Sequence, residues 1–172
     1  MVVSVLAATL FALSWVLPAP AAFAEESEGT TGTKVPQSTC LSGMQWKAGD
    51  EGSPEMHPGW NCISCHAQGE GPRFIVAGTV YQQLDEPNDC YGVEGVVVQL
   101  TDAKGKVIRM TTNLAGNFAA RARSGSIAFP ITAKVLYKGN ESVMASPQST
   151  GNCAQCHTAK GRNGAPGRIV AP

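Results

Sequence analysis

Apolar side chains in the middle of the chain alternate with polar ones at the two-residue period of a β-strand. Five such runs are separated by residues that favour turns: 74–81, 95–101, 107–112, 118–123 and 127–137. The segments 102–106 and 113–117 between them contain the Asp, Asn and Gly residues typical of tight turns. The spacing predicts a mainly β fold, a small antiparallel β-sandwich over residues 73–146.

The chain on either side of this β module has a different character. Residues 40–72 and 147–172 are rich in glycine and proline, a density that disfavours long helices. We therefore expect two irregular loop segments, 40–72 and 147–172, that flank the sandwich.

The first 24 residues carry no charged side chain and run through an apolar stretch to the small-residue box 22–24. This pattern is typical of a secretory signal peptide, with an uncleaved membrane anchor as the alternative. Residues 25–39 are polar without an apolar period, so we expect a flexible leader there. The sequence thus predicts export to the periplasm, the extracellular space or the cell surface, with no stable membrane span in the mature chain.

Charge narrows the choice of partners. The 172 residues contain 13 basic and 13 acidic side chains, a balance that argues against binding nucleic acid. Residues 25–94 hold 11 acidic and 3 basic side chains, whereas residues 95–172 hold 2 acidic and 10 basic ones. This polarity could orient a partner protein during encounter, or the two halves could neutralise each other within the fold.

Four of the six cysteines form two Cys-x-x-Cys-His motifs. This arrangement holds haem c covalently, because both thiols add to the vinyl groups and the histidine that follows reaches the iron as an axial ligand. Two of only three histidines in the chain stand at that position. We predict two haem c groups with their iron, bound by Cys62, Cys65 and His66 and by Cys153, Cys156 and His157.

Three other interpretations of these cysteines stay open. A zinc site made of two Cys-x-x-Cys knuckles would leave the paired histidines unexplained and would have to span the 87 residues between Cys65 and Cys153. A thioredoxin-like redox pair would require a βαβ unit, which the flanking sequence does not resemble. A plain disulfide framework is compatible with export.

Together with the signal sequence, the two motifs resemble a small dihaem c-type cytochrome. Residues 96–102, Gly105, 111–113 and 116–118 resemble the carboxypeptidase regulatory-like, transthyretin-like β-sandwich. The resemblance implies an electron carrier or relay, not an enzyme, that meets redox partner proteins or a larger electron-transfer complex. A small redox enzyme with one open haem iron and a haem-bearing binding subunit of a larger complex are the alternatives.

Each iron either takes a sixth ligand or stays open. Met56 or His57 is the candidate at the first haem and Met144 at the second, because each shortly precedes a motif. Exposed positions for Met56 and His57, and a core or strand-end position for Met144, are the alternatives. Met110 lies inside a strand pattern and is expected to pack in the core.

Two cysteines and two arginines remain. In an oxidising compartment we expect Cys40 and Cys90 to form a disulfide that pins the first loop segment to the β module, with two separate thiols as the alternative.

Arg162 and Arg168, in the glycine-rich loop after the second motif, could pair with haem propionates or be solvated at the surface.

Overall fold

The computed structural model describes residues 40, 42–44, 52–69, 71–122 and 125–172. The predicted signal peptide, 1–24, and leader, 25–39, lie outside these residues. The elements in chain order are α1 Cys62–Ala67, β1 Phe74–Tyr81, β2 Val97–Thr101, β3 Val107–Thr111, β4 Asn117–Arg121, β5 Thr132–Tyr137, β6 Asn140–Val143, the 3-10 turn η2 Cys153–Gln155 and β7 Ile169–Val170.

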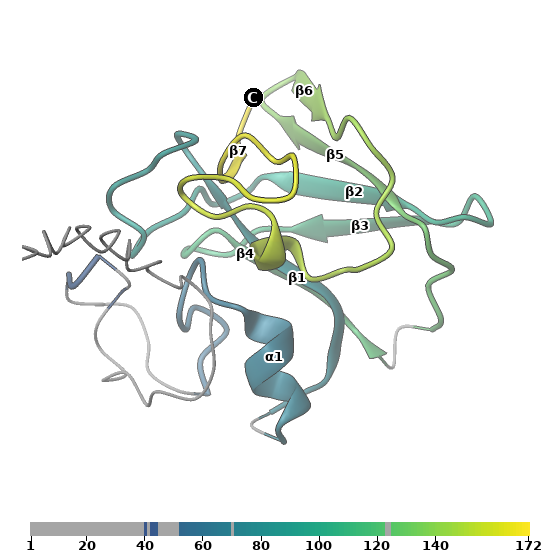
Figure 1. Cartoon of the computed structure of the whole chain (residues 1–172), viewed down its shortest axis with the longest axis horizontal. Coiled ribbons are helices and arrows are strands. Elements are labelled where there is room, and N and C mark those ends of the chain that lie inside the picture. The colour runs from purple at the N-terminus through teal and green to yellow at the C-terminus, as the bar shows by residue number, and fades with distance from the viewer. Residues whose placement is uncertain (1–39, 41, 45–51, 70, 123–124) are drawn as a thin grey trace, which may run out of the picture.

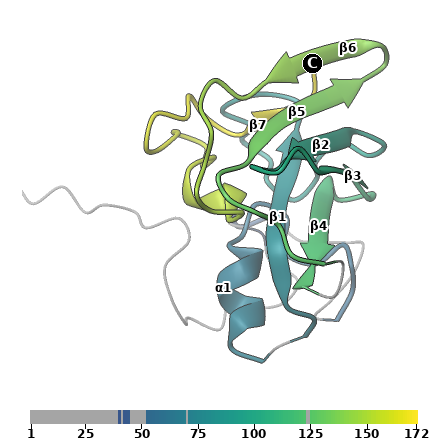
Figure 2. The same cartoon turned by 90° about the vertical axis from the view of Figure 1, so that its right-hand side faces the viewer.

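The strands form two sheets, with the orders β4-β1-β7 and β3-β2-β5-β6. Every pair of neighbouring strands is antiparallel except β1 and β7, which run parallel. The mainly β class expected from the apolar alternation is therefore confirmed (Figures 1 and 2).

The core lies between the two sheets. Alternate residues of each strand point inward: Val98 and Leu100 are buried in β2, as are Phe118 and Ala120 in β4. The buried cluster joins both sheets and comprises Val76, Val80, Val96, Val98, Leu100, Met110, Phe118, Ala120, Ile131, Val135 and Ala171. Each large side chain in such a cluster contributes on the order of 1.5–3 kcal/mol by leaving water.

Strand β1 contacts the helix α1, the turn η2 and the strands β4 and β7. Its last six residues, 76–81, are all buried, whereas β2 and β4 alternate. A strand becomes buried throughout when both of its faces are covered. Here α1 and η2 both pack against β1, and Figures 1 and 2 show α1 and the yellow-green turn of η2 next to each other beside this strand.

The structure differs from the sequence-based expectation in three elements. The expected strand 127–137 is shorter, because β5 begins at Thr132, after Pro130, which has no N–H to donate to a ladder. A further strand, β6, follows a tight turn in which Lys138 has φ 49° and Gly139 has φ 88°, the positive values that hairpin turns require. Strand β7 lies in the segment expected to be irregular.

The first loop segment also contains more order than expected. Residues Cys62–Ala67 form a six-residue helix, which begins where the Asn61 side chain accepts a hydrogen bond from the Ser64 N–H at 3.0 Å. An Asn at this position satisfies one of the free N–H groups of the first turn. The helix is short, so the expectation that no long helix forms here stands.

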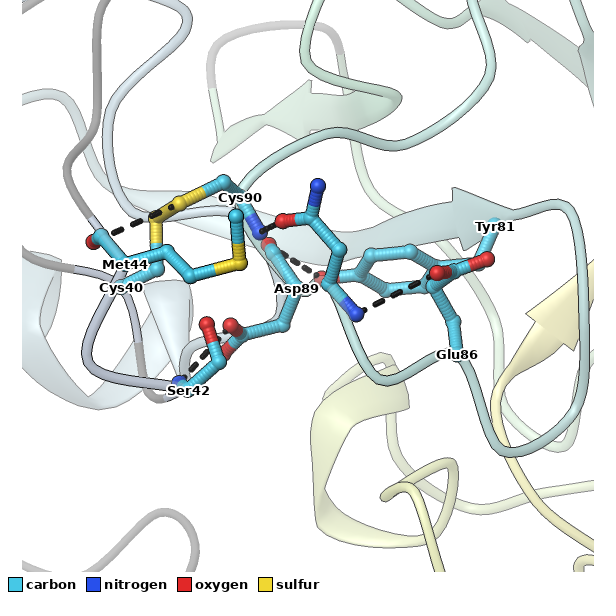
Figure 3. The surroundings of a disulfide bond; sticks show 8 residues. Cys40, Ser42, Met44, Tyr81, Glu86, Asp89 and Cys90 are labelled. Atoms are coloured by element: carbon cyan, nitrogen blue, oxygen red, sulfur yellow. Dashed lines mark hydrogen bonds between the residues drawn. A yellow bond between two sulfur atoms is a disulfide. The ribbon is translucent and has the colours of Figure 1, made fainter.

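The disulfide between Cys40 and Cys90 is confirmed, with Cα atoms 5.3 Å apart. Figure 3 shows how the surrounding residues join the first segment to the β module: Ser42 N–H donates to Asp89 Oδ1 at 2.9 Å, and the Tyr81 hydroxyl donates to Asp89 O at 3.1 Å. The bond therefore ties the start of the described chain to the loop that follows β1. Within the described ranges, no helix has the length and apolar character needed to cross a membrane.

Candidate haem sites

The first motif lies on α1, which places its three chemical groups on one short helix. Cys62 is half-buried at the start, Cys65 is exposed, and His66 is buried with 8% exposure. The helix brings Cys65 and His66 one turn beyond Cys62. The spacing of the motif therefore places two thiols and one imidazole on a single rigid element.

The imidazole of His66 has a tight environment. Its ring centroid lies 4.5 Å from that of Phe74, and a Cβ on Gly71 would stand 2.9 Å from the ring atoms Cε1 and Nδ1. Gly71 has φ 122°, so both its conformation and the lack of a side chain suit this position. The His66 Nδ1 atom is buried without a hydrogen-bond partner in the described part of the chain. This ring nitrogen of His66 therefore differs from most buried polar atoms, which have a hydrogen-bond partner.

A cavity of about 490 Å³ opens beside Cys62 and His66. Met56 is one of the described residues that line it, and His57 is not. The ring of His57 lies 5.0 Å from that of Trp60 instead. Met110, expected to pack in the core, is 8% exposed in the core cluster and also lines this cavity. Two arginines, Arg109 and Arg121, contribute to its polar side.

The β module holds the segment that carries Met56. Asn117 Nδ2 donates to Met56 O at 2.9 Å, and Asn117 Oδ1 accepts from the Thr79 hydroxyl at 2.7 Å. The Thr79 oxygen in turn accepts from Gly59 N–H at 2.9 Å. Asn113 Nδ2 donates to Pro54 O at 2.6 Å. These bonds fix the backbone of the segment against β1 and β4 and so position Met56 beside the cavity.

The second motif docks on the edge of β1. Ala77 N–H donates to Gly151 O at 3.0 Å, and Ala77 pairs in a parallel bridge with Asn152, the residue before Cys153. A Cβ on Gly151 would collide with Ile75 O, so glycine permits this close approach. The backbone of β1 thus sets the place at which the second motif begins.

His157 has the arrangement of an oriented metal ligand. Its Nδ1 atom lies 3.0 Å from Gly167 O, a carbonyl that can only accept, so the proton resides on Nδ1. The lone pair of a neutral imidazole is then on Nε2. Histidines that ligate metals commonly donate their other ring N–H to a backbone carbonyl, which fixes the tautomer and the orientation of the ring.

A second cavity, of about 380 Å³, lies beside this motif. Cys153, Cys156, His157 and Met144 all line it, so the structure brings Met144 to the motif with which its sequence position associated it. Apolar side chains of both sheets form much of the remaining wall: Val98, Leu100, Phe118, Ile131, Ala133 and Val135.

The two motifs are neighbours. Burial raises the pKa of the Cys62 thiol to about 11, and burial together with the charges of Cys62 and Cys156 raises the pKa of the Cys153 thiol to about 12. The helix α1, which begins at Cys62, and the turn η2, which begins at Cys153, both pack against β1. Phe118 lines both cavities and therefore forms a wall that they share.

The residues present fit haem c at both motifs. Each motif has two thiols and a histidine at the required spacing, and each lies beside a cavity of a few hundred cubic ångströms. The wall of the first cavity includes two methionines, Met56 and Met110, and that of the second includes Met144. Among the described residues, no group of three or more His, Cys, Asp or Glu side chains is arranged to hold a bare metal ion.

Several supporting residues were not found by sequence reasoning. Asn117 and Phe118 act through tertiary contacts with residues distant in the chain, and a single sequence gives no signal for such contacts. Gly71 contacts His66, five residues earlier in the chain. Comparisons with protein-family models, with curated proteins and with solved structures find no match to this chain. The functional conclusion therefore depends on the two motifs and on the geometry around them.

Proposed function

We propose that this chain is an exported electron-transfer protein that holds two haem c groups and passes single electrons between redox partner proteins. One observation carries the proposal: each Cys-x-x-Cys-His motif lies beside its own cavity, and that cavity contains a methionine. This function is the one that the resemblance of the two motifs to small dihaem c-type cytochromes implies. The two packed sheets would support both haem segments, as the resemblance to the carboxypeptidase regulatory-like sandwich implies.

The chain's own residues would hold the groups as follows. Each cysteine S–H would add across one vinyl double bond, so that sulfur bonds one carbon, the hydrogen goes to the other, and nothing leaves. His66 and His157 would each donate a ring nitrogen to one iron. When bound, haem c supplies a one-electron couple between ferric and ferrous iron.

Met56 and Met144 are the proposed sixth ligands. Both line the cavity of the motif that follows them in sequence, whereas the ring of His57 lies against that of Trp60 at an angle of 36°. A thioether on the iron raises the reduction potential relative to a second histidine. The pair would therefore work as an acceptor of comparatively high potential.

The position of both motifs on β1 supports a relay between the two sites. Ala77 lines the first cavity, and its backbone pairs with Asn152 next to Cys153. Phe118 borders both cavities. An electron that enters at one site would therefore pass to the other by way of β1 and Phe118.

The test is expression of the full chain together with the haem c maturation machinery, followed by intact mass and absorption spectra. We expect a mass gain of two haems and low-spin bands in both oxidation states. The double variant Cys153→Ser/Cys156→Ser should gain one haem and keep the spectrum of the first site. A chain that carries zinc or disulfides at these cysteines, and no covalent haem, would overturn the proposal. Carbon monoxide binding to the reduced protein would instead identify an open iron and favour a redox enzyme.

A further inference from the structure

The two candidate methionine ligands are held by the fold in different ways. Met144 directly follows β6, and its N–H donates to Ala133 O at 2.9 Å, which continues the ladder between β5 and β6. Met56 lies in the segment 52–59, which consists of turns and bends and contains no strand or helix. The sheet itself therefore holds Met144, whereas Met56 depends on contacts between its segment and the β module.

The segment 52–59 needs these contacts to keep its conformation. His57 has φ 42°, a left-handed value that is uncommon for a residue other than glycine. Such a backbone conformation persists where the surrounding structure imposes it. The place of Met56 beside the first cavity is therefore decided by tertiary hydrogen bonds.

One chain of hydrogen bonds runs from this segment through two side chains of the β module. Gly59 N–H can only donate, so the Thr79 oxygen accepts it at 2.9 Å, and the Thr79 proton goes to Asn117 Oδ1 at 2.7 Å. The amide nitrogen of Asn117 then faces Met56 O, to which it donates at 2.9 Å. Thr79 and Asn117 are opposite each other in the pairing of β1 with β4, and Thr79 is buried. The pair thus holds the segment at Met56 and at Gly59.

We propose that Thr79 and Asn117 are positioning residues for the sixth ligand of the first haem: by holding the segment 52–59 they keep the Met56 thioether on the iron and the iron closed. This inference rests on the proposed function. Loss of either side chain leaves its hydrogen-bond partners unpaired, which favours release of the segment into water. An iron that loses its sixth ligand becomes open to a small external ligand.

The experiment uses the two-haem protein and compares Thr79→Val, which lacks the hydroxyl, with Thr79→Ser, which keeps it. Asn117→Asp keeps the Oδ1 acceptor and loses the Nδ2 donor. Thr112→Val is the matched control: the Thr112 hydroxyl also accepts from Val96 N–H at 2.9 Å and donates to Val93 O at 2.6 Å, and Thr112 lines neither cavity. The measurements are the methionine-to-iron charge-transfer bands and the carbon monoxide bound per reduced chain.

We expect Thr79→Val and Asn117→Asp to lose the charge-transfer band of the first haem and to bind one carbon monoxide per chain. Thr79→Ser and Thr112→Val should keep both bands and bind none. A residue that only stabilises the fold would instead make Thr79→Val resemble Thr112→Val. Retention of both bands in Thr79→Val and Asn117→Asp overturns the inference, as does equal carbon monoxide binding by Thr112→Val. If one of the two test variants does not fold, the other decides.

The intact mass of the wild type separates this inference from the function on which it rests. A wild-type chain without two covalent haems overturns the proposed function itself. Two covalent haems, together with an unaltered first haem in both test variants, overturn only the role of Thr79 and Asn117.

Discussion

Gly78, in the middle of β1, lies directly against Cys153: a Cβ on Gly78 would stand 2.8 Å from the Cys153 Cβ and 2.8 Å from Phe118 Cζ. The second motif is therefore close to the central strand because that strand has no side chain at this point. The same strand pairs with Asn152 at the neighbouring residue, Ala77. Strand β1 thus fixes the second motif by its backbone and by the lack of one side chain.

The substitution Gly78→Ala tests this relationship. The added methyl group must displace Cys153 or Phe118, and overpacking of this kind costs about 1–3 kcal/mol. We expect the midpoint of urea unfolding to fall and the attachment of haem at the second motif to decrease, while the first motif keeps its haem. Intact mass and urea denaturation measure the two effects. Full occupancy of both motifs with unchanged stability would contradict the packing described for Gly78.

The sequence predicted those parts of the fold that depend on local pattern. Strands β1 to β4 all overlap runs that the apolar pattern predicted, although β1 is buried on both faces and does not alternate. The pairing of Cys40 with Cys90 was expected from the predicted export and from the prediction that the other four cysteines form motifs. Strand β6 was missed because all four of its residues are exposed, which removes the alternation. Strand β7 has two residues and is defined by its pairing with β1, a contact between distant parts of the chain.

The candidate site likewise combines features that the local sequence predicts with features that depend on the fold. The Cys-x-x-Cys-His motif is a local pattern, so its spacing alone predicts a role for Cys62, Cys65 and His66. The neighbourhood of the two motifs depends on tertiary structure, because 87 residues separate Cys65 from Cys153 and only the fold brings them to one strand. Met110 lies at the wall of the first cavity although its strand pattern indicated only packing, because its side chain belongs to the core cluster and also borders this cavity.

Replacement of the proposed methionine ligands tests the sixth position. Met56→Leu and Met144→Leu nearly keep the volume of the side chain and remove the thioether sulfur. The free energy of unfolding should therefore change by less than about 1.5 kcal/mol. Each variant should lower the potential of one haem and abolish its methionine-to-iron charge-transfer band. Redox titration with absorption spectroscopy measures both changes.

Met110→Leu is the matched control for Met56→Leu, because Met110 lines the same cavity. It should leave both potentials and both charge-transfer bands unchanged. The opposite result, in which Met110→Leu loses the band and Met56→Leu keeps it, would assign the first iron to Met110.

Asp102 provides a prediction on pH. Its Oδ2 accepts from Ala128 N–H at 3.1 Å, and its Oδ1 accepts from Lys104 N–H at 2.8 Å and Lys106 N–H at 2.9 Å. The Ala128 bond and then those of Lys106 and Lys104 lower the pKa of this carboxyl below its ordinary value of 3.8. A carboxyl whose pKa is lower in the folded state stabilises the fold above the unfolded pKa. That contribution is lost as the pH falls through the folded pKa.

We therefore expect Asp102→Asn to lower the melting temperature at pH 7, and the difference from the wild type to shrink as the pH is lowered below 3.8. Asp85→Asn, at an exposed position, is the control and should change little at either pH. Thermal unfolding followed by circular dichroism measures the effect. A difference that stays constant across the acid range would show that the carboxylate charge does not stabilise the hairpin.

Removal of the disulfide tests both its contribution to stability and the assignment of the remaining cysteines. The bond closes a sequence separation of 50 residues, for which the chain-entropy model gives about 4 kcal/mol. The double variant Cys40→Ala/Cys90→Ala should therefore lose about 2–4 kcal/mol of unfolding free energy.

Thioethers resist thiol reductants, whereas disulfides do not. Alkylation of the reduced, denatured two-haem protein should therefore label two of the six cysteines, Cys40 and Cys90, and leave the other four unmodified. Labelling of all six would show that none of the motif cysteines carries a covalent haem.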